Sequence, residues 1–441
     1  MFEKFKKLIK YTILKHIPLK GCTYMKKQIL ALSAAAVLLL PQAAGAEGFA
    51  INEWSAEGVA MGGARMFAEG DAANIAYNPA SIAKVEGEAF KQSAVYISPH
   101  GKYTLENKDG STESGQNVVH AAWVPGGYYV KQLNDKEWFG IGAYTRFGMI
   151  SEFERSSTAA TNAFFSKLVG VSVTPTYARK FDKKWSAAVG AEINYVGLDL
   201  EKNAYMAGHV LGPTHTEGES YALGWNAAVN YAFDEKNEMG VVYRSKIKHS
   251  MEADFHGYYP TGTISRDAYG EVTLPDSWSI GYSHKFDEKT RVEINGTWTG
   301  WSSYDALNIY FNGSIVPPNL GGIDLPNIDR SESPKNWSDG WRYAIGVEHK
   351  LSDKYSLLAG FAYDESSIPY DGGDFIVPTG NRRTYSIGAQ YHDKDQTLAM
   401  TLGWMDIGGL DFAGHQTDGY SSAHTYDNYA KIFGISYQRN F

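Results

Sequence analysis

The sequence predicts an all-β protein: a 14-stranded antiparallel transmembrane β-barrel with a small N-terminal plug inside the lumen. Three observations predict this fold, namely an N-terminal export signal, short polar turns that alternate with longer loops, and strands in which apolar and polar residues alternate. A strand protein in a bilayer must pair every backbone N–H and C=O internally, so only a closed barrel can span the membrane.

Residues 1–46 are typical of an export signal. Two lysines precede an apolar run from Ile29 to Leu40, and an Ala-Gly-Ala cleavage site ends at Ala46. Met25 offers a second start, so residues 1–24 are either an over-long gene start or an extended n-region. We expect the mature chain to begin directly after the cleavage site.

The charge of the mature chain argues against a nucleic-acid partner. Eight of the 41 basic residues and one of the 49 acidic residues precede residue 47, which leaves 33 − 48 = −15. Nucleic-acid binding requires the opposite sign. The single cysteine, Cys22, lies within the signal, so no disulfide framework is expected. Beyond residue 46 no apolar run of about eighteen residues occurs, which argues against helical spans.

Six short turns, each with an aspartate and a lysine, punctuate the chain. They occupy residues 133–136, 181–184, 233–236, 286–289, 351–354 and 392–395. Outer-membrane barrels have short periplasmic turns and longer outer loops. We therefore expect these turns on the periplasmic side and the loops 202–218, 257–270 and 311–336 outside.

Strands are expected between these turns and loops. The predicted strands are 90–104, 117–131, 137–150, 169–181, 184–201, 219–233, 237–256, 270–286, 289–310, 337–350, 354–367, 380–392, 396–410 and 424–441. The number is even, and the six turns follow every second strand, as a barrel with both ends on one side requires.

Alternation along the strands separates a lipid face from a lumen face. In the strand 185–195, Trp185 and Val189 share one face, while Glu192 and Asn194 lie on the other. The first face suits lipid and the second suits a lumen. The 30 tyrosines and 11 tryptophans are compatible with interfacial girdles.

Residues 47–89 are rich in glycine and alanine and have no sustained alternation. They are too few for an independent domain, so we expect a plug inside a barrel formed by residues 90–441. The alternative is a disordered periplasmic tail, but the segment is more apolar than disorder favours. Its larger apolar residues are Phe49, Ile51, Trp54, Val59, Met61 and Phe67.

Short motifs recur through the mature sequence in a definite order. They are Gly48-Phe49-x-Ile51-Asn52-Glu53, Asn78-Pro79-Ala80, Pro125-Gly-Gly-Tyr128-Tyr129, Gly240-Val-Val-Tyr243-Arg244-Ser245-Lys246, Leu274-Pro275-x-Ser277-Trp278-Ser279-x-Gly281, Trp341-Arg342-Tyr343-x-x-Gly346 and Gly360-Phe-Ala-Tyr363-Asp364-Glu365-Ser366 with Arg382-Arg383. In this order the chain resembles the FadL-like outer-membrane transporters of long-chain fatty acids and aromatic hydrocarbons. Two departures are Met61-Gly-Gly-Ala64-Arg65, where the family carries Gly-Arg-Ala, and Ser81, where a glycine is common.

The resemblance implies a gate between the plug and the third strand. Asn78-Pro79-Ala80 forms a rigid turn on local grounds, and the family implies that this turn packs against an inward bend of that strand. Glycine within a strand often marks a bend, and Gly148 is the preferred position. A gap there would let an apolar solute leave sideways into the bilayer. Phe49 and Ile51 would shift as ligand fills a pocket, by a change in populations.

Apolar residues of the outer loops are expected to capture the ligand first. Those expected to bind it are Tyr258, Tyr259, Phe311, Ile315 and Val316.

Three cations, Arg244, Lys246 and Lys248, alternate along the seventh strand and are expected on one face. Pairing with luminal acids is the default explanation for such charges, and holding a substrate carboxylate is the alternative. Arg342, Arg382 and Arg383 have the same two explanations.

Signals for other chemistry are weak. The chain has no His-Glu-x-x-His, P-loop or Gly-x-Ser-x-Gly motif, so we expect no catalysis and no cofactor. Acidic residues at 324–329 and 371–374 are more often solvated than bound to calcium, and we expect no metal. A hydrophilic porin is the main rival, followed by an energised receptor and a lipid-modifying barrel enzyme.

The expected partners are a hydrophobic small molecule, outer-membrane lipid and lipopolysaccharide, and the barrel-assembly machinery. The C-terminal aromatic residue, Phe441, resembles the signal that such machinery reads. We expect a monomer.

Overall fold

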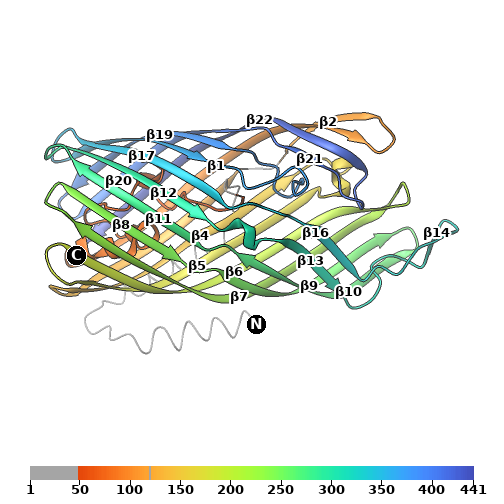
Figure 1. The fold of residues 1–441 in the computed structure, drawn as a ribbon, viewed down its shortest axis with the longest axis horizontal. Helices are drawn as coiled ribbons and strands as arrows, with labels where there is room; N and C mark the ends of the chain where they lie inside the picture. The colour runs from red at the N-terminus through yellow and green to blue at the C-terminus, as the bar shows by residue number, and fades with distance from the viewer. Residues whose placement is uncertain (1–47, 119–120) are drawn as a thin grey trace.

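A computed structural model describes residues 48–118 and 121–441, so the predicted export signal at 1–46 lies outside the described residues. The chain forms a closed antiparallel β-barrel of 14 strands around a core of short helices and loops (Figure 1). The predicted fold class is confirmed. No helix in these two ranges is both long and apolar enough to span a bilayer.

Several wall strands are interrupted and carry two labels each. The first seven positions in the wall are β1 (Glu88–Asn107), β3 (Ala122–Asn134), β4 (Glu137–Glu152), β5 (Phe165–Lys180), β6 (Trp185–Met206), β7 (His209–Ala232) and β8 with β9 (Asn237–Arg244, Ile247–Tyr259). The remaining seven are β10 with β11 (Gly262–Leu274, Ser277–Lys285), β12 with β13 (Thr290–Thr299, Ala306–Phe311), β16 with β17 (Arg330–Pro334, Gly340–Lys350), β18 (Tyr355–Asp364), β19 (Arg382–Asp393), β20 with β21 (Gln396–Ile407, Asp411–Ala413) and β22 (Tyr420–Asn440). The short strands β2 (Thr112–Gln116), β14 (Asn319–Leu320) and β15 (Ile323–Asp324) belong to loops.

The first and last wall strands close the barrel. β1 pairs with β22 from Ala89↔Asn440 to Asn107↔Tyr420, and β1 also pairs with β3. Each predicted short turn joins two consecutive wall strands, and these turns lie at the end of the barrel that carries the C-terminus (Figure 1). All six predicted turns are confirmed.

Two of the three predicted outer loops are in fact strand. β6 and β7 continue through 202–218 and meet at Ala207-Gly208, whose positive φ values of 51° and 83° form a tight hairpin turn. β9 and β10 likewise fill 257–270 and are joined by residues 260–261. Apolar and polar residues do not alternate regularly in 202–218 and 257–270, so the period of two that indicates a strand is missing there. Residues 311–336 do contain a loop, although β16 takes its last part.

The alternation within the membrane is confirmed. Trp185 and Val189 are 46% and 59% exposed on the outer face, whereas Glu192 and Asn194 are fully buried. Large apolar side chains cover the outside of most wall strands. The lumen face carries both buried polar residues and apolar residues that pack against the plug.

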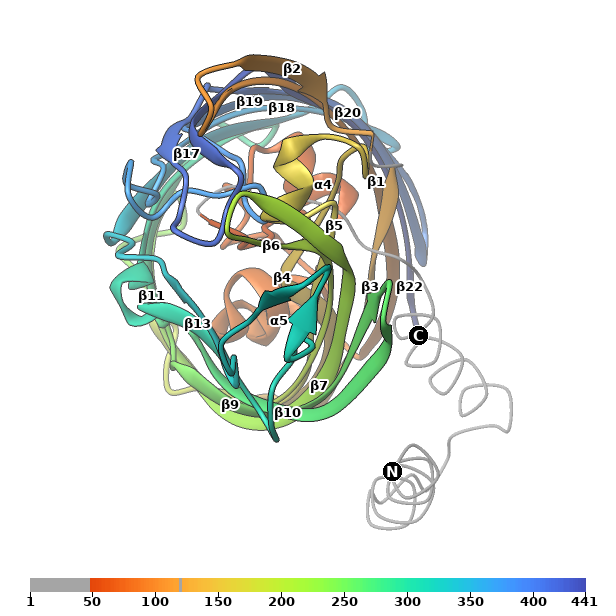
Figure 2. The same cartoon turned by 90° about the vertical axis from the view of Figure 1, so that its right-hand side faces the viewer.

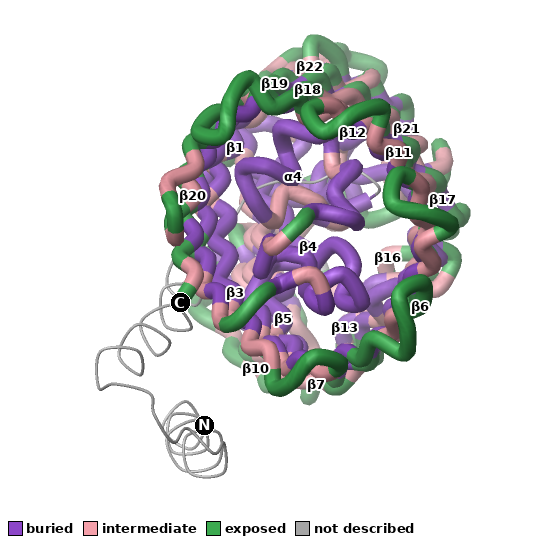
Figure 3. The backbone as a smooth tube through the Cα atoms, turned by 90° about the vertical axis from the view of Figure 1, so that its left-hand side faces the viewer, coloured by how far each residue is buried: buried purple, intermediate pink, exposed green. Residues whose placement is uncertain are grey.

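Residues 48–87 lie inside the barrel, as both end-on views show (Figures 2 and 3). They form α4 (Ala56–Ala60), α5 (Asn74–Tyr77) and the 3₁₀ helix η2 (Pro79–Lys84). Ser55 begins α4 because its hydroxyl accepts a hydrogen bond from the N–H of Gly58 at 3.0 Å. Asn78 caps η2 in the same way, with Pro79 at its first position. We call residues 48–87 the plug.

Candidate functional site

β4 leaves its neighbour β3 halfway along the wall. The two strands pair from Asn134↔Glu137 to Gly126↔Tyr144, and past that point residues 122–125 of β3 pair with β1 alone. β4 continues beside β5 to Glu152, where its carbonyl accepts the N–H of Val118 at 2.8 Å. Within the described ranges no ladder pair joins β3 to residues 145–152, so the hydrogen-bond ladder of the wall is interrupted there, and we call this interruption the lateral opening.

A β-bulge at Arg146 bends β4 at this opening. Thr145 opposes Val171 of β5 and Phe147 opposes Gly170, so Arg146 is an extra residue on β4. The bend therefore lies at Arg146, two residues before Gly148, where the sequence predicted it. Gly148 serves a close approach instead, since a Cβ atom there would lie 2.9 Å from Cδ1 of Ile51.

The N-terminal segment of the plug pairs with the bent part of β4. The N–H of Gly148 donates to the carbonyl of Phe49, and the N–H of Ile51 donates to the carbonyl of Arg146, both at 2.8 Å. Ala50 and Phe147 form an antiparallel bridge. Residues 49–51 thus act as a short strand that occupies backbone groups of β4 next to the opening. We call residues 48–54 the gate segment.

Aromatic rings surround Phe49, which is 1% exposed. Its ring centroid lies 4.7 Å from Trp301 and 5.2 Å from Tyr304, with Phe147 and Trp337 both at 6.0 Å. We call this group the aromatic cage. The sequence analysis did not identify the two tryptophans of the cage. They lie between β12 and β13 and between β16 and β17, and the predicted strands and loops showed no interruption at these places.

A largely apolar cavity of about 70 Å³ adjoins the outer part of the bend. Residues 149–151 of β4 form one side, and β1, β20, β22 and the β18–β19 loop form the rest. Ile150 also packs with Ala122 of β3, across the lateral opening. The lining includes Tyr103, Met149, Ile150, Phe153, Val377, Pro378, Met405, Ile407 and Ala430. We call this space the apolar cavity.

A second cavity, of about 50 Å³, has a more polar lining and lies against the gate segment, and we call it the polar cavity. Arg146 and Phe147 of β4 line it, so consecutive parts of the bend face the two cavities. Its other polar lining residues are Asn52, Arg244, Ser277, Ser279, Asn295, Thr297, Thr299 and Arg342. Arg342 pairs with Asp364 at 2.7 Å.

The three cations of the seventh predicted strand do not share a face, so that prediction is wrong. The interruption between β8 and β9 shifts the alternation by one residue. Arg244 is 4% exposed and points into the lumen, where it donates to the carbonyl of Ala76. Lys246 and Lys248 are exposed outside, the latter paired with Glu271 at 2.8 Å.

The predicted capture residues lie together at the tips of the outer hairpins. Tyr259 and Val316 belong to one buried apolar cluster that Ile315 joins, and the Tyr259 hydroxyl donates to the carbonyl of Ile315. Phe311 packs on Phe255 with ring centroids 5.0 Å apart. Tyr258 is half exposed. These residues are not in the cluster that contains the gate segment's Phe49.

The Asn78-Pro79-Ala80 turn does not meet the bend. Asn78 is fully buried, and its Nδ2 donates to Oδ1 of Asn230 on β7 at 2.7 Å. Asn230 in turn donates to the hydroxyl of Ser81, which donates to the carbonyl of Met66 at 2.6 Å. The turn therefore fastens the plug to β7, and Ser81 uses the hydroxyl that a glycine would lack.

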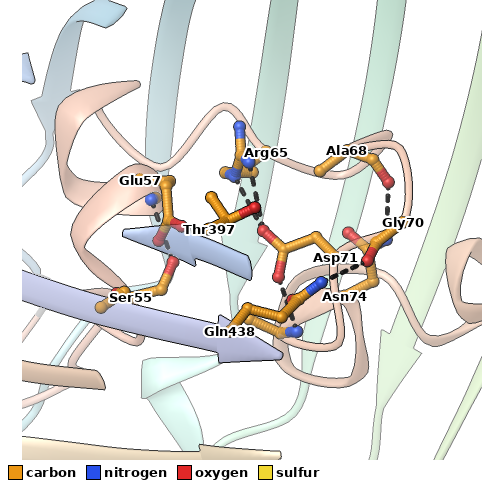
Figure 4. A network of polar contacts seen from close by, with 12 residues as sticks. Ser55, Glu57, Arg65, Ala68, Gly70, Asp71, Asn74, Thr397 and Gln438 are labelled. Carbon is orange, nitrogen blue, oxygen red and sulfur yellow. Dashed lines mark hydrogen bonds and ion pairs between the residues drawn. The ribbon is translucent and has the colours of Figure 1, made fainter. Parts of the chain in front are cut away.

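Buried ion pairs fasten the inner part of the plug to the barrel (Figure 4). Lys91 of β1 lies 2.8 Å from both Glu57 and Asp71, and Asp71 lies 3.1 Å from Arg65. Burial opposes the charge on Asp71, but Lys91 and Arg65 outweigh it and lower the pKa of Asp71 to about 2. Barrel residues Glu348, Arg291 and Glu293 extend the network.

We call these seven residues, Glu57, Arg65, Asp71, Lys91, Arg291, Glu293 and Glu348, the ionic anchor. Sequence reasoning did not find it, because its partners are far apart in the chain. The one signal was Lys91, a cation at a lumen-facing position of the first strand. Gln438 of β22 adds neutral bonds, donating to the carbonyl of Gly70 at 2.7 Å and accepting the N–H of Ala72 at 3.0 Å (Figure 4).

The remaining arginines and loop acids have protein partners. Arg383 lies 3.4 Å from Asp406, and Arg382 donates to Thr379 and to the carbonyl of Gly48. Asp374 pairs with the buried Lys335 and accepts two backbone N–H groups. Across residues 48–118 and 121–441, no group of three or more His, Cys, Asp or Glu side chains is placed to hold a metal ion.

Comparison with known proteins identifies the family to which the chain is similar. Residues 37–441 match the family described as "Outer membrane protein transport protein (OMPP1/FadL/TodX)". The chain is 24% identical to the long-chain fatty acid transport protein of Escherichia coli K12 over 84% of this chain and 90% of that protein. It is 26% identical to outer membrane protein P1 of Haemophilus influenzae over 87% of this chain and 91% of that protein.

Solved structures share the fold. A FadL homologue of Pseudomonas aeruginosa superposes with a TM-score of 0.77 at 17% identity, covering 89% of this chain and all of that one. The toluene transporter TodX of P. putida gives 0.66 at 17% identity, covering 88% and 98%. The protein is located in the outer membrane of a Gram-negative bacterium, and the chain belongs to the OMPP1/FadL/TodX family of outer membrane transport proteins.

Proposed function

We propose that this protein carries hydrophobic small molecules passively across the outer membrane and releases them sideways between β3 and β4. The observation that carries the proposal is the bend of β4 at Arg146, where the strand leaves β3 and pairs with the gate segment. A bulge that opens a membrane-embedded wall costs ladder hydrogen bonds, so its presence beside an apolar cavity supports a role in passage.

Transport begins at the outer hairpins in this proposal. Tyr258, Tyr259, Phe311, Ile315 and Val316 capture the solute, which then enters the apolar cavity. An apolar chain loses roughly 0.8 kcal/mol for each CH₂ group returned to water, so apolar contacts at each of these places lower the barrier to crossing. From this cavity the opening beside Ile150 leads to the bilayer.

Displacement of the gate segment opens the route. Two backbone hydrogen bonds and the aromatic cage hold the segment, and a ligand that competes for the cage would shift it without any chemical energy. Phe49, Ile51 and Gly148 are the gate residues in this scheme, while Asn78, Pro79 and Ala80 keep the rest of the plug in place.

The substrate class rests on relatives of the same family. One is named for long-chain fatty acids and another for toluene, and both kinds of molecule are hydrophobic over most of their surface. Arg244 lines the polar cavity and is the residue we assign to a substrate carboxylate, whereas the outward position of Lys246 removes our reason to include it. The members of its family are transport proteins, which supports a role without catalysis.

The protein's surroundings complete the proposal. Lipid and lipopolysaccharide surround its apolar wall, and it works as a monomer. The barrel-assembly machinery reads Phe441, whose side chain is 51% exposed and whose N–H donates to the carbonyl of Glu88 at 2.8 Å.

A reversible disulfide tests the proposed gate. Ala50→Cys with Phe147→Cys replaces the two residues of the antiparallel bridge, and the mature chain has no other cysteine. Under oxidation we expect uptake of labelled oleate and toluene to stop, and reduction should restore it. Phe147→Cys alone is the control for loss of the ring. Full uptake by the completely oxidised protein would exclude movement of the gate segment.

A further inference from the structure

A buried ion pair is located at the bend of β4. Nη1 of Arg146 lies 2.9 Å from both carboxylate oxygens of Glu192, and the two side chains are 4% and 0% exposed. Glu192 belongs to β6, two strands away from β4, with β5 between them. The pair therefore reaches across the inner face of β5 from the bulged residue itself.

The carboxylate of Glu192 is held in a fixed position. The hydroxyl of Ser172 on β5 donates to it at 2.6 Å, and Nδ2 of Asn194 donates to the same hydroxyl at 2.8 Å. Asn194 also bonds His249 of β9 at 2.9 Å. This chain of hydrogen bonds joins three wall strands next to the bend, so Arg146 pairs with a partner that has little freedom to follow it.

The bulge at Arg146 decides which way Phe147 points. If the register Gly126↔Tyr144 continued without a bulge, Phe147 would lie opposite Trp123, whose ring packs beside Tyr96 on the outer face. With the bulge, Phe147 instead enters the aromatic cage. The bend thus determines both the lateral opening and one wall of the gate.

We propose that the Arg146–Glu192 pair is the positioning element that holds β4 in its inward bend and so keeps the lateral opening in the wall. This inference rests on the proposed sideways exit. A strand that has lost its partner on one side would regain ladder hydrogen bonds by straightening onto β3, so something must oppose that movement. Removing one member of a buried pair leaves an uncompensated charge, which makes the paired, bent form strongly preferred.

The location of the pair separates it from the ionic anchor. The ionic anchor joins plug to barrel, whereas Arg146 and Glu192 both belong to the wall. Arg146 also accepts the N–H of Ile51 through its carbonyl, so the same residue fixes the bend and receives the gate segment. Its guanidinium lies 5.0 Å from the ring of Phe147, which adds a further contact on the bent form.

Two readouts test the pair. Glu192→Gln keeps the volume of the side chain and removes its charge, and Arg146→Gln removes the other partner. The first readout is uptake of labelled oleate per folded barrel, measured on the heat-modifiable fraction. The second is disulfide formation between Trp123→Cys and Phe147→Cys, which a straightened β4 would bring opposite each other. Glu293→Gln is the matched control, since Glu293 is equally buried and paired with an arginine away from the bend.

We expect each variant of the pair to lower uptake about tenfold or more and to raise cross-linking several-fold, because the bent form loses its compensating charge. Glu293→Gln should leave the cross-link unchanged. Unchanged uptake and unchanged cross-linking in both variants would overturn the inference. If the unmodified protein gave no uptake above an empty strain, the proposed function would fail, while the cross-link would still decide whether the pair holds the bend.

Discussion

Two parts of the plug, residues 57–71 and the gate segment, are fixed to the barrel in different ways. The ionic anchor holds residues 57–71 through buried charges on both sides of the plug–barrel contact. The gate segment is held by two backbone hydrogen bonds to β4 and by the rings around Phe49. Charge pairing in a buried setting resists small displacements, whereas ring contacts can be replaced by an apolar ligand. The comparison identifies a fixed part of the plug, residues 57–71, and a movable part, the gate segment.

Energies support this division. Removing one partner of a buried ion pair costs about 3–5 kcal/mol, because the other charge is left without compensation. A neutral hydrogen bond contributes only about 1 kcal/mol net, and an aromatic pair adds about 0.5–1.5 kcal/mol. A ligand shifts the gate segment only by the difference in its affinity for the two positions of the segment. Replacing contacts of about 1 kcal/mol each requires a smaller difference than breaking a buried ion pair of the anchor.

The largest effect is expected from Lys91→Met. This change leaves Glu57 and Asp71 without their shared cation and should weaken plug attachment by about 3–5 kcal/mol. We expect a leak of small ions through the variant in planar bilayers. Lys102→Met is the control, since its pair with Asp427 is exposed. If the Lys91→Met variant showed no ion leak, the anchor would not be what holds the plug.

Acid should loosen the anchor through Asp71. Its pKa is depressed to about 2 in the folded protein, so its stabilising contribution is complete above the ordinary value near 4 and is lost as the pH falls through about 2. We expect plug release, followed as ion leak, to rise across this window. Asp71→Asn should leak at neutral pH and lose this part of the acid response. An identical acid response in that variant would assign the titration to other groups.

Phe49→Ala should affect the gate segment without affecting the ionic anchor. Loss of the ring leaves a space within the aromatic cage and weakens the closed position by about 3–5 kcal/mol at most. We expect the affinity for hydrophobic ligand to change several-fold, measured by equilibrium dialysis, with no ion leak. Phe49→Leu, which fills much of the space, should have a smaller effect. An ion leak equal to that of Lys91→Met would show that the gate segment and residues 57–71 are not held differently.

Asn78→Ala should have the smallest effect. The side chain caps η2 and bonds Asn230, so its loss should destabilise this part of the plug by about 1–2 kcal/mol. Because the turn lies on β7 rather than on the bend, we expect oleate uptake to change less than twofold. A large loss of uptake at normal folded amounts would place Asn78 in the gate after all.

The sequence predicted the features that depend on local chemistry. The six turns carry Asp, Asn and Ser in polar runs, and the alternation of Trp185 and Val189 with Glu192 marks lipid and lumen directly. The outer hairpins escaped prediction because strands beyond the bilayer need no such alternation. A single interruption after Arg244 reversed the expected direction of Lys246, since one residue changes the face of every side chain that follows.

The candidate site was harder to predict because it depends on distant pairings. A glycine at 148 suggested a bend, yet the bulge lies at Arg146, where the buried partner Glu192 is 46 residues away. The ionic anchor joins Asp71 to Lys91 across 20 residues and Arg65 to Glu348 across 283. Spacing along the chain does not show such contacts. The plug was predictable from its composition. The contacts that hold the gate segment and residues 57–71 were not.

Photo-cross-linking of a fatty acid that carries a diazirine near its methyl end tests the sideways exit most directly. During uptake, the route predicts adducts on both sides of the opening, at Trp123 and Val124 of β3 and at Ile150 of β4, mapped by mass spectrometry. These adducts should disappear when the Ala50–Phe147 cysteine pair is oxidised. Adducts confined to the plug and the periplasmic turns, with none at the opening, would contradict a lateral route.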